Sequence, residues 1–455
     1  MKTRVLVPSG ALGLTYDLKA LEQGLKKRPD IIAIDGGSTD SGPSYLGQGI
    51  SKYSRQSTKT EWKILMEARA RANIPLLIGT AGTCGTDSAV DWLLDITREI
   101  AKDLNQSLKI VTIKCSQPRP KIIEFLKSGK IKALSNAPKI SKSKIRGCRN
   151  IVALAGVEQI IEALNEKPDI VIAGRTTDTA VIAALPILRG IDAGAAWHGA
   201  KIAECGALCT THPMSGVIIV EFCGDHFIIE PMAKTAKATV NTVSAHMLYE
   251  NSDPYILYEP GGHLDTSTAI YTALNERKVS VSGSKWYKAP TYNVKLEGAE
   301  LVGFQTIALV LLRDAKYVKN AEKWTRDIKS KCSKSIKEKL KIDYTDFSLE
   351  LRIIGKNACF GKLEIKKSEV HEVGVLGIVT AKTQLLANEI AQILNPFLLH
   401  HPLTEDEPLP TFAFPFSPAE ISRGPLYSFS LNHVLELTNP MEVFSMDIYV
   451  NDQSS

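Results

Sequence analysis

The chain has 455 residues, which predicts two or three domains because a single hydrophobic core rarely extends over so many residues. A hydrophobic content of 44% and a charged content of 23% are typical of a soluble globular protein. No apolar run is long enough to span a membrane and the N-terminus reads as a strand rather than a signal peptide, so we expect a cytoplasmic protein with no membrane partner.

The net charge of +6 comes mainly from lysine-rich stretches. They lack interleaved aromatic residues, so we expect solvated surface and no nucleic-acid partner. The eight cysteines form no CxxC pair, which argues against a zinc ribbon and, without a secretory signal, against a disulfide framework. Cys205 and Cys209 have a spacing that could face a metal from one helix, but no second pair accompanies them.

In chain order, Arg4 to Val7 predicts a first strand, followed by a glycine-bearing turn and a helix. The turn lacks the GxGxxG spacing, so no nicotinamide cofactor is assigned. Ile31 to Ile34 predicts a second strand, which runs into a loop of glycines, hydroxyls and carboxylates. In that loop Ser38 and Thr39 supply donors, and Asp35 and Asp40 could bind a cation or act as bases. A plain Asx-turn loop explains the same composition without a function.

Further strands and helices alternate along the chain. Pro75 to Ile78 predicts a third strand, and its following loop carries Thr80 and Thr83. Leu108 to Ile113 and Ile151 to Ala155 predict the fourth and fifth strands. Alternation at about thirty-residue spacing is typical of an α/β fold with a largely parallel sheet covered by helices.

The stretch Pro168 to Ala180 carries the strongest local signal. An apolar strand ends in Gly174 and is followed by Arg175, Thr176, Thr177 and Asp178, and then by an apolar helix. Arg175 would offer a planar fork to a carboxylate or phosphate, and we expect it to be exposed and unpaired in the empty protein. The alternative is that Arg175 pairs with Asp178 and only closes the turn.

Carboxyl ends of parallel strands share one edge of a sheet, where ligands bind in open α/β folds. We therefore expect one cleft at this edge, surrounded by the polar side chains of several strand ends. Its expected members are Ser38, Asp40, Thr83, Arg175 and Asp178.

Beyond Leu188 the pattern changes. Ala196 to Gly206 would, as a helix, place Lys201 and Glu204 close enough to pair. Glu259 to Asp265 reads as a loop whose acid, imidazole and glycines are typical of a site, although lone histidines such as His246 and His263 are more often structural.

A lysine-rich helical stretch over Tyr317 to Lys341 indicates a domain boundary. We therefore predict an α/β core region over residues 1–315, a helical connection over 316–345 and a smaller C-terminal α+β domain over 346–455.

Several of these motifs resemble the acyclic terpene utilisation AtuA-like family. One departure is the first turn, where the family usually has a richer glycine loop and this chain has Pro8-Ser9-Gly10, so the resemblance supports no nucleotide role there. The resemblance covers nearly the whole chain and implies a function in branched-acid or terpenoid catabolism without fixing the reaction. The motifs that carry it are Asp35–Gly47, Ile78–Thr83, Asp91–Trp92, Ile172–Ala180, Trp197–Gly206, Leu248–Asn251, Glu259–Gly262, Val281–Ser284, Val294–Gly298, Phe416–Ile421 and Tyr427–His433.

Two functions follow as hypotheses. The first is an enzyme, a hydratase or other hydro-lyase or an isomerase, acting on a small carboxylate or acyl-CoA; the second is a non-catalytic acyl-binding or scaffold subunit. We expect a homo-oligomer, and a divalent metal such as Mg²⁺ is left open with Asp35, Asp40 and Glu259 as ligands. The expected catalytic residues are Asp40, Asp178, Glu204 and His263, and the expected substrate-binding residues are Ser38, Thr39, Thr80, Thr83, Arg175, Thr176 and Lys201.

Overall fold

The computed structural model describes residues 2–356, 358–365 and 369–451. The chain divides into two compact units, a first unit of Met1–Glu300 with Phe429–Ser455 and a second unit of Leu301–Ser428. This division differs from the boundaries expected after residues 315 and 345. The lysine-rich helix lies inside the second unit, and the last part of the chain returns to the first unit.

The first unit is built on a ten-stranded sheet whose centre is parallel, which confirms the predicted α/β class. The parallel strands lie in the order β1 (Lys2–Val7), β2 (Ile31–Asp35), β3 (Leu76–Gly79), β7 (Ile170–Ala173) and β4 (Leu108–Lys114). Antiparallel strands extend both sides. They are β8 (Ile218–Cys223), β9 (His226–Pro231), β13 (Lys278–Ser282) and β12 (Ile270–Asn275) beyond β1, and β19 (Ser445–Asn451) beyond β4.

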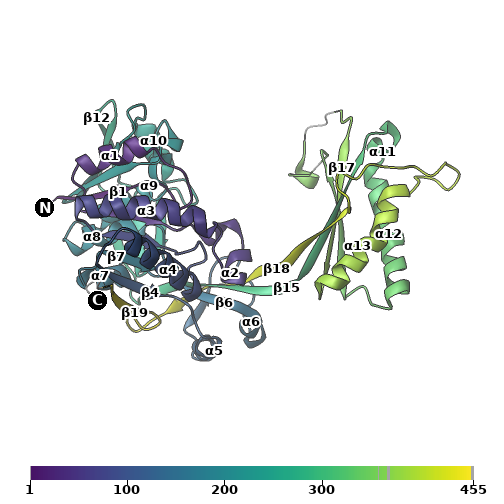
Figure 1. Cartoon of the computed structure of the whole chain (residues 1–455), viewed down its shortest axis with the longest axis horizontal. Coiled ribbons are helices and arrows are strands. Elements are labelled where there is room, and N and C mark those ends of the chain that lie inside the picture. Colours follow the sequence, from purple (N-terminus) through teal and green to yellow (C-terminus); the bar gives the residue numbers. More distant parts are fainter. Residues whose placement is uncertain (1, 357, 366–368, 452–455) are drawn as a thin grey trace. The chain divides into compact units, whose positions relative to one another are not determined.

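Helices cover both faces of this sheet (Figure 1). Successive strand residues point to opposite faces, so Leu6 and Ile32 join one hydrophobic cluster and Val5 and Ile31 join another. The first cluster includes residues of α1 (Leu18–Lys26), α3 (Arg55–Ala72) and α4 (Asp87–Asp103), and the second includes residues of α7 (Val157–Asn165), α8 (Ala180–Leu188) and α9 (Ala193–Ala203).

The predicted fifth strand is not part of the parallel sheet. Strand β6 (Cys148–Ala153) pairs antiparallel with the first part of β15 (Asn293–Leu312), with Ala153 opposite Leu296. Both sides of β4 are occupied, because β4 pairs with β7 on one side and with β19 on the other. The strand that fills this edge comes from the far end of the sequence, so local alternation could not reveal it.

The segment expected as a loop over Glu259 to Asp265 is a hairpin. Strands β10 (Ile256–Glu259) and β11 (Gly262–Asp265) pair antiparallel, and β14 (Lys285–Lys288) adds a third strand. Smaller elements of the first unit are α2 (Ser44–Gln48), α5 (Arg119–Lys127), β5 (Ile131–Ala133), α6 (Lys142–Gly147) and α10 (Val240–His246), with short 3-10 turns at Thr39–Ser41, Gly206–Cys209 and Pro213–Ser215.

The second unit has its own sheet and core. Strand β17 (Val373–Ala381) pairs antiparallel with β16 (Phe347–Ile354) on one side and with the second part of β15 on the other. Helices α12 (Ala321–Leu340) and α13 (Gln384–His400) supply Trp324, Ile328 and Leu394 to one hydrophobic cluster that lies wholly in this unit. The unit also contains α11 (Ala315–Lys319) and a 3-10 turn at Gly361–Leu363, and the chain leaves it through β18 (Glu420–Glu436).

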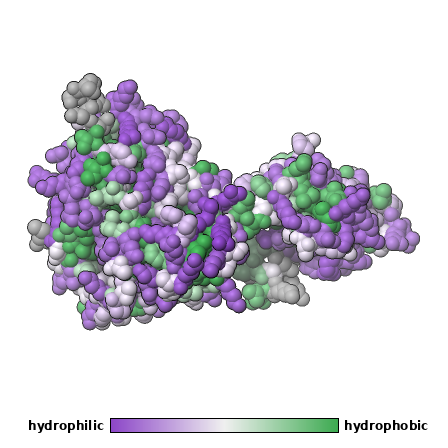
Figure 2. Space-filling model, turned by 90° about the horizontal axis from the view of Figure 1, so that it is seen from below, coloured by the Kyte–Doolittle hydropathy of each residue, from purple (hydrophilic) through white to green (hydrophobic). Residues whose placement is uncertain are grey.

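On the face shown in Figure 2, hydrophilic residues predominate and hydrophobic residues form separate patches. In the parts of the chain that the structure describes, no helix combines the length and hydrophobicity of a membrane span.

Candidate active site at the carboxyl edge of the parallel strands

Close backbone contacts bring the ends of β2, β3 and β7 together. The amide of Gly36 donates to the carbonyl of Gly79 at 2.7 Å, and the amide of Thr80 donates to the carbonyl of Gly174 at 2.8 Å. A Cβ on Gly36 would lie 2.4 Å from the Thr80 carbonyl oxygen, and one on Gly79 would lie 2.2 Å from Thr176 Oγ1. Both positions therefore require glycine, and the predicted meeting of the strand ends is confirmed.

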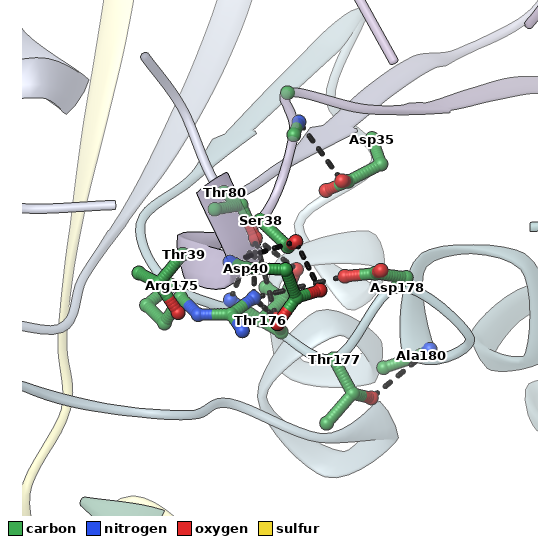
Figure 3. Close-up of polar contacts among 12 residues, drawn as sticks. Asp35, Ser38, Thr39, Asp40, Thr80, Arg175, Thr176, Thr177, Asp178 and Ala180 are labelled. Carbon is green, nitrogen blue, oxygen red and sulfur yellow. Dashed lines mark hydrogen bonds and ion pairs between the residues drawn. The ribbon is translucent and has the colours of Figure 1, made fainter. Parts of the chain in front are cut away.

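Arg175 lies in the middle of this junction (Figure 3). Its Nε donates to Glu297 Oε2 at 3.2 Å, and its Nη1 donates to the Thr176 carbonyl at 2.6 Å and to Thr80 Oγ1 at 3.2 Å. Asp178 Oδ1 lies 3.6 Å from Nη1. The side chain is only 6% exposed. The expectation of an exposed, unpaired arginine was therefore wrong, and the alternative pair with Asp178 is the weaker of two ion pairs.

Glu297, at the start of β15, is the main partner of Arg175 and was not among the expected site residues. Its Oε2 also accepts the Thr39 hydroxyl at 2.8 Å, and its Oε1 lies 2.9 Å from the Lys295 ammonium. Burial alone would raise the pKa of Glu297, but the charges of Arg175 and Lys295 and their hydrogen bonds lower it to about 2. Glu297 is therefore ionised at neutral pH.

The loop after β2 places its residues at different depths. Asp35 is buried; its Oδ2 accepts the Gly37 amide at 2.8 Å, while its Oδ1 has no partner within the described residues. Burial, with repulsion from Asp178, raises the pKa of Asp35 well above its usual value. Ser38 is half-buried and donates to the exposed Asp40 at 2.5 Å.

The two threonines of the loop after β3 form hydrogen bonds inside the protein. The Thr83 hydroxyl donates to the Gly36 carbonyl at 3.1 Å, and Thr80, at a φ of +47°, binds Arg175. Both side chains are buried. These two threonines therefore hold the strand ends together, and Ser38 is the hydroxyl of the expected set that lies nearer solvent.

A second group of buried charges comes from α9 and β10. As predicted, Lys201 pairs with Glu204, with Nζ and Oε1 2.5 Å apart, and Lys201 Nζ also donates to the Tyr249 carbonyl at 2.9 Å. Glu259, which ends β10, accepts a hydrogen bond from the Thr179 hydroxyl at the start of α8. Burial raises the pKa of Glu204 to about 8 and that of Glu259 to about 7.

Asp178 connects the two groups electrostatically. Burial raises its pKa; the charges of Arg175 and Lys201 act in the opposite direction, and Asp40 adds to the rise. The carboxylate also raises the pKa values of Asp35, Glu204 and Glu259. Its side chain is 27% exposed, so solvent reaches it. Asp178 is therefore the accessible member of an otherwise buried cluster.

The charges of this cluster do not balance. The carboxyl cluster, which we define as Asp35, Asp178, Glu204, Glu259 and Glu297, contains more acids than its partners Arg175, Lys201 and Lys295 can neutralise. An uncompensated buried carboxylate is costly. Some of these groups must therefore hold protons near neutral pH or interact with a bound cation.

His263 lies apart from the cluster. Glu259 pairs with Gly262 across the hairpin and Tyr258 pairs with His263, so alternation along the strands turns His263 to the face opposite Glu259. Its ring stacks on Tyr287, with centroids 5.2 Å apart. Within the described residues, His263 makes no polar contact with the cluster.

The structure does not gather the metal ligands that the sequence suggested. Within the described residues, Asp35, Asp40 and Glu259 do not form a close three-ligand group. A cavity of about 670 Å³ lies elsewhere, between α5 and β6, and none of the cluster residues lines it.

Sequence reasoning missed Glu297, Thr179 and the role of β15. Glu297 follows Val294 and Leu296 in a strand, and a glutamate in such a pattern reads as solvent-facing. In the structure it is buried beside Thr39 and Arg175, from segments distant in the sequence. Glu297 did lie in one of the motifs that carried the family resemblance, which was the available signal.

Together the fold and the cluster define an α/β protein with a polar site at the carboxyl edge of its parallel strands. Residues 51–405 match the family described as "Acyclic terpene utilisation family protein AtuA", and the chain belongs to this family. The matched span includes Arg175, Lys201, Glu259 and Glu297 but begins after the Asp35 to Asp40 loop. Comparison with curated proteins and with solved structures gave no match.

Proposed function

We propose that this AtuA-family chain is an enzyme that acts on a small carboxylate or acyl-CoA, by addition or elimination of water or by isomerisation next to a carboxylate. One observation carries the proposal: carboxyl groups from five separate segments converge with Arg175 and Lys201 where parallel strands end. This edge is the usual ligand position in open α/β folds. Both reactions require a proton to be moved at a carbon or oxygen next to a polarised group.

Asp178 is the proposed proton carrier. A general base must be reachable by the substrate, and its pKa must lie closer to neutrality than that of an ordinary aspartate. Asp178 meets both requirements, because it is partly exposed and burial raises its pKa. Asp40, exposed beside it and hydrogen-bonded to Ser38, would hold a second proton site at the entrance.

Arg175 and Lys201 would orient the substrate. Within the described residues, Arg175 uses Nε and Nη1, and no hydrogen bond involves Nη2. That nitrogen could donate to a substrate carboxylate or carbonyl, while Glu297 holds the guanidinium in place. Ser38 would add a hydroxyl donor for developing negative charge.

The alternative is a non-catalytic acyl-binding or scaffold subunit. One observation favours it: both cations are already paired inside the protein, Arg175 with Glu297 and Lys201 with Glu204. A site that has to recognise an anion usually keeps a cation available.

Purified protein incubated in D₂O with unsaturated and hydroxylated carboxylic acids and their CoA thioesters, with and without divalent metals, distinguishes the two. Turnover, or incorporation of deuterium next to the carboxylate, supports the enzyme. Binding without turnover or exchange supports the scaffold subunit. Asp178→Asn should slow turnover by about 10²- to 10⁴-fold, whereas Glu276→Gln, at a carboxylate that is 85% exposed, is the control that should not slow it.

We also propose that the chain is cytoplasmic and forms a homo-oligomer. Cell fractionation and analytical ultracentrifugation test these two points; a membrane-bound pool or a monomer at micromolar concentration would contradict them.

A further inference from the structure

We propose that Glu204, Cys205 and His246 form a binding site for a divalent metal ion of the Zn²⁺ class. One ligand atom of each residue, a carboxylate oxygen, the thiol sulfur and a ring nitrogen, lies within 4.8 Å of the other two. Glu204 and Cys205 directly follow α9, and His246 is the last residue of α10. Two segments that are distant in the sequence thus bring three different ligand types to one point.

The donor set indicates which metal fits. Mg²⁺ and Ca²⁺ prefer oxygen ligands only, whereas thiolate and imidazole together favour Zn²⁺ and neighbouring first-row metals. Three protein ligands leave a fourth position of a tetrahedral ion open, as in catalytic zinc sites. The inferred site therefore differs in both residues and metal from the Mg²⁺ site that the sequence left open.

The state of His246 is an independent reason to expect a ligand. The residue is 5% exposed, and its Nε2 is buried without a hydrogen-bond partner in the described residues. An unsatisfied buried polar atom typically costs stability. Stacking on Tyr249, with ring centroids 5.3 Å apart and planes 10° apart, fixes the orientation of the imidazole. A metal ion bound at Nε2 would give this atom the partner that it lacks.

Charge also favours a cation at this point. The carboxyl cluster contains more acids than Arg175, Lys201 and Lys295 neutralise, and a divalent ion would supply the missing positive charge. The Lys201 ammonium, 2.5 Å from Glu204 Oε1, is the local competitor. Binding therefore requires Glu204 to use its other oxygen or Lys201 to withdraw, and the Cys205 thiol releases its proton to solvent as the metal–sulfur bond forms.

Cys209, the cysteine four residues after Cys205, does not belong to the site and serves as its control. The sequence suggested that Cys205 and Cys209 would face a metal from one helix, but α9 ends at Ala203. Cys209 lies in the following 3-10 turn, where it is buried and its thiol donates to the Gly206 carbonyl. The structure therefore groups Cys205 with Glu204 and His246 and not with Cys209.

Metal binding to the full-length chain tests the proposal without any assay of activity. Chelator-treated protein is titrated with Co²⁺ and then with Zn²⁺, and the thiolate-to-cobalt charge-transfer absorption is recorded. We expect one Co²⁺ per chain with this absorption, displaced by Zn²⁺, in the wild type and in Cys209→Ser.

Cys205→Ser should lose the charge-transfer absorption, and His246→Gln should bind Co²⁺ at least about tenfold more weakly. Far-UV circular dichroism checks that each variant is folded. The site is excluded if folded wild-type protein binds no stoichiometric Co²⁺, or if Cys205→Ser keeps the absorption. Because the readout is metal binding, failure here leaves the proposed proton-transfer function standing, and failure of that function leaves the metal site standing.

Discussion

At the residue scale, the largest difference between expectation and structure concerns Arg175, which is buried and paired. The sequence correctly placed it at the end of a buried strand beside Thr176 and Asp178. Its burial depends on Glu297, which lies 122 residues further along the chain. Local pattern could identify the strand end, but it could not identify which distant acid would cover the guanidinium.

The ion pair between Arg175 and Glu297 should be important for stability. Removing one partner of a buried pair leaves the other charge uncompensated, so Arg175→Met and Glu297→Gln should each lower the free energy of unfolding by about 3–5 kcal/mol. Chemical denaturation measures this, and the double variant should lose less than the sum of the single losses. Arg55→Met, which breaks the exposed pair with Glu99, is the control and should hardly change stability. If Arg175→Met had an equally small effect on stability, Arg175 would be exposed and unpaired, as the sequence suggested.

Glu259 should make stability depend on pH in a defined window. Burial raises its pKa from 4.5 to about 7. Between these values the folded protein holds a proton that the unfolded chain has released, so stability falls as pH rises through the window. Glu259→Gln removes this titration. As the pH rises from 4.5 to 7, the free energy of unfolding of the variant should increase relative to that of the wild type by at most about 3 kcal/mol. Above pH 7 the difference should not change further.

Urea denaturation from pH 5 to pH 9 measures the difference between the two proteins. A constant difference across this range would show that Glu259 does not titrate there.

At the element scale, the site depends on three strand-to-loop junctions that touch through glycine. The sequence predicted these strands as parts of a largely parallel sheet covered by helices. It also showed the concentration of glycine after them. It did not predict the hairpin that carries Glu259 or the antiparallel pairing of β6 with β15, because both depend on partners distant in the sequence. The parallel strands could be predicted because each is a local apolar run. The hairpin and the β6–β15 pairing could not, because no local pattern encodes them.

Gly79 offers a direct test of the junction. A methyl group there would lie 2.2 Å from Thr176 Oγ1 and 2.6 Å from Val181 Cγ1. Gly79→Ala should therefore destabilise the protein by about 1–3 kcal/mol through overpacking and should reduce ligand binding at Arg175. Gly374→Ala is the matched strand control, since its nearest neighbour is the flexible end of Leu309 at 3.2 Å. Equal thermal stability of the two variants would argue against a tightly packed junction.

At the scale of the whole molecule, the second unit is inserted between Glu300 and Phe429 of the first. The lysine-rich helix predicted as a connection is amphipathic, and its apolar side packs Trp324 and Ile328 into the core of the second unit. Composition pointed to a boundary near the lysine-rich helix, whereas the compact units meet at residues 300–301 and 428–429. It could not show that the chain returns, because β19 becomes an edge strand only through its pairing with β4.

Separate cores predict separate local stability. Ile328→Ala should lower the free energy of unfolding of the second unit by about 2–5 kcal/mol, and Ile172→Ala should lower that of the first unit by a similar amount. Each substitution truncates a fully buried side chain in one cluster. Hydrogen exchange followed by mass spectrometry should show faster exchange within residues 301–428 for Ile328→Ala and outside them for Ile172→Ala. Faster exchange throughout the chain in both variants would mean that the units unfold as one.

The central claim is that the carboxyl cluster moves a proton of a bound carboxylate or acyl thioester, with Asp178 as the accessible group. The most direct measurement is ¹H NMR of the substrate panel in D₂O with wild-type protein, Asp178→Asn and the control Glu276→Gln. We predict that at least one substrate exchanges or turns over with the wild type and the control, and that Asp178→Asn slows this by about 10²- to 10⁴-fold while remaining folded. A compound that binds at this site yet shows neither exchange nor turnover with the wild type, or reacts equally fast with Asp178→Asn, would contradict the account.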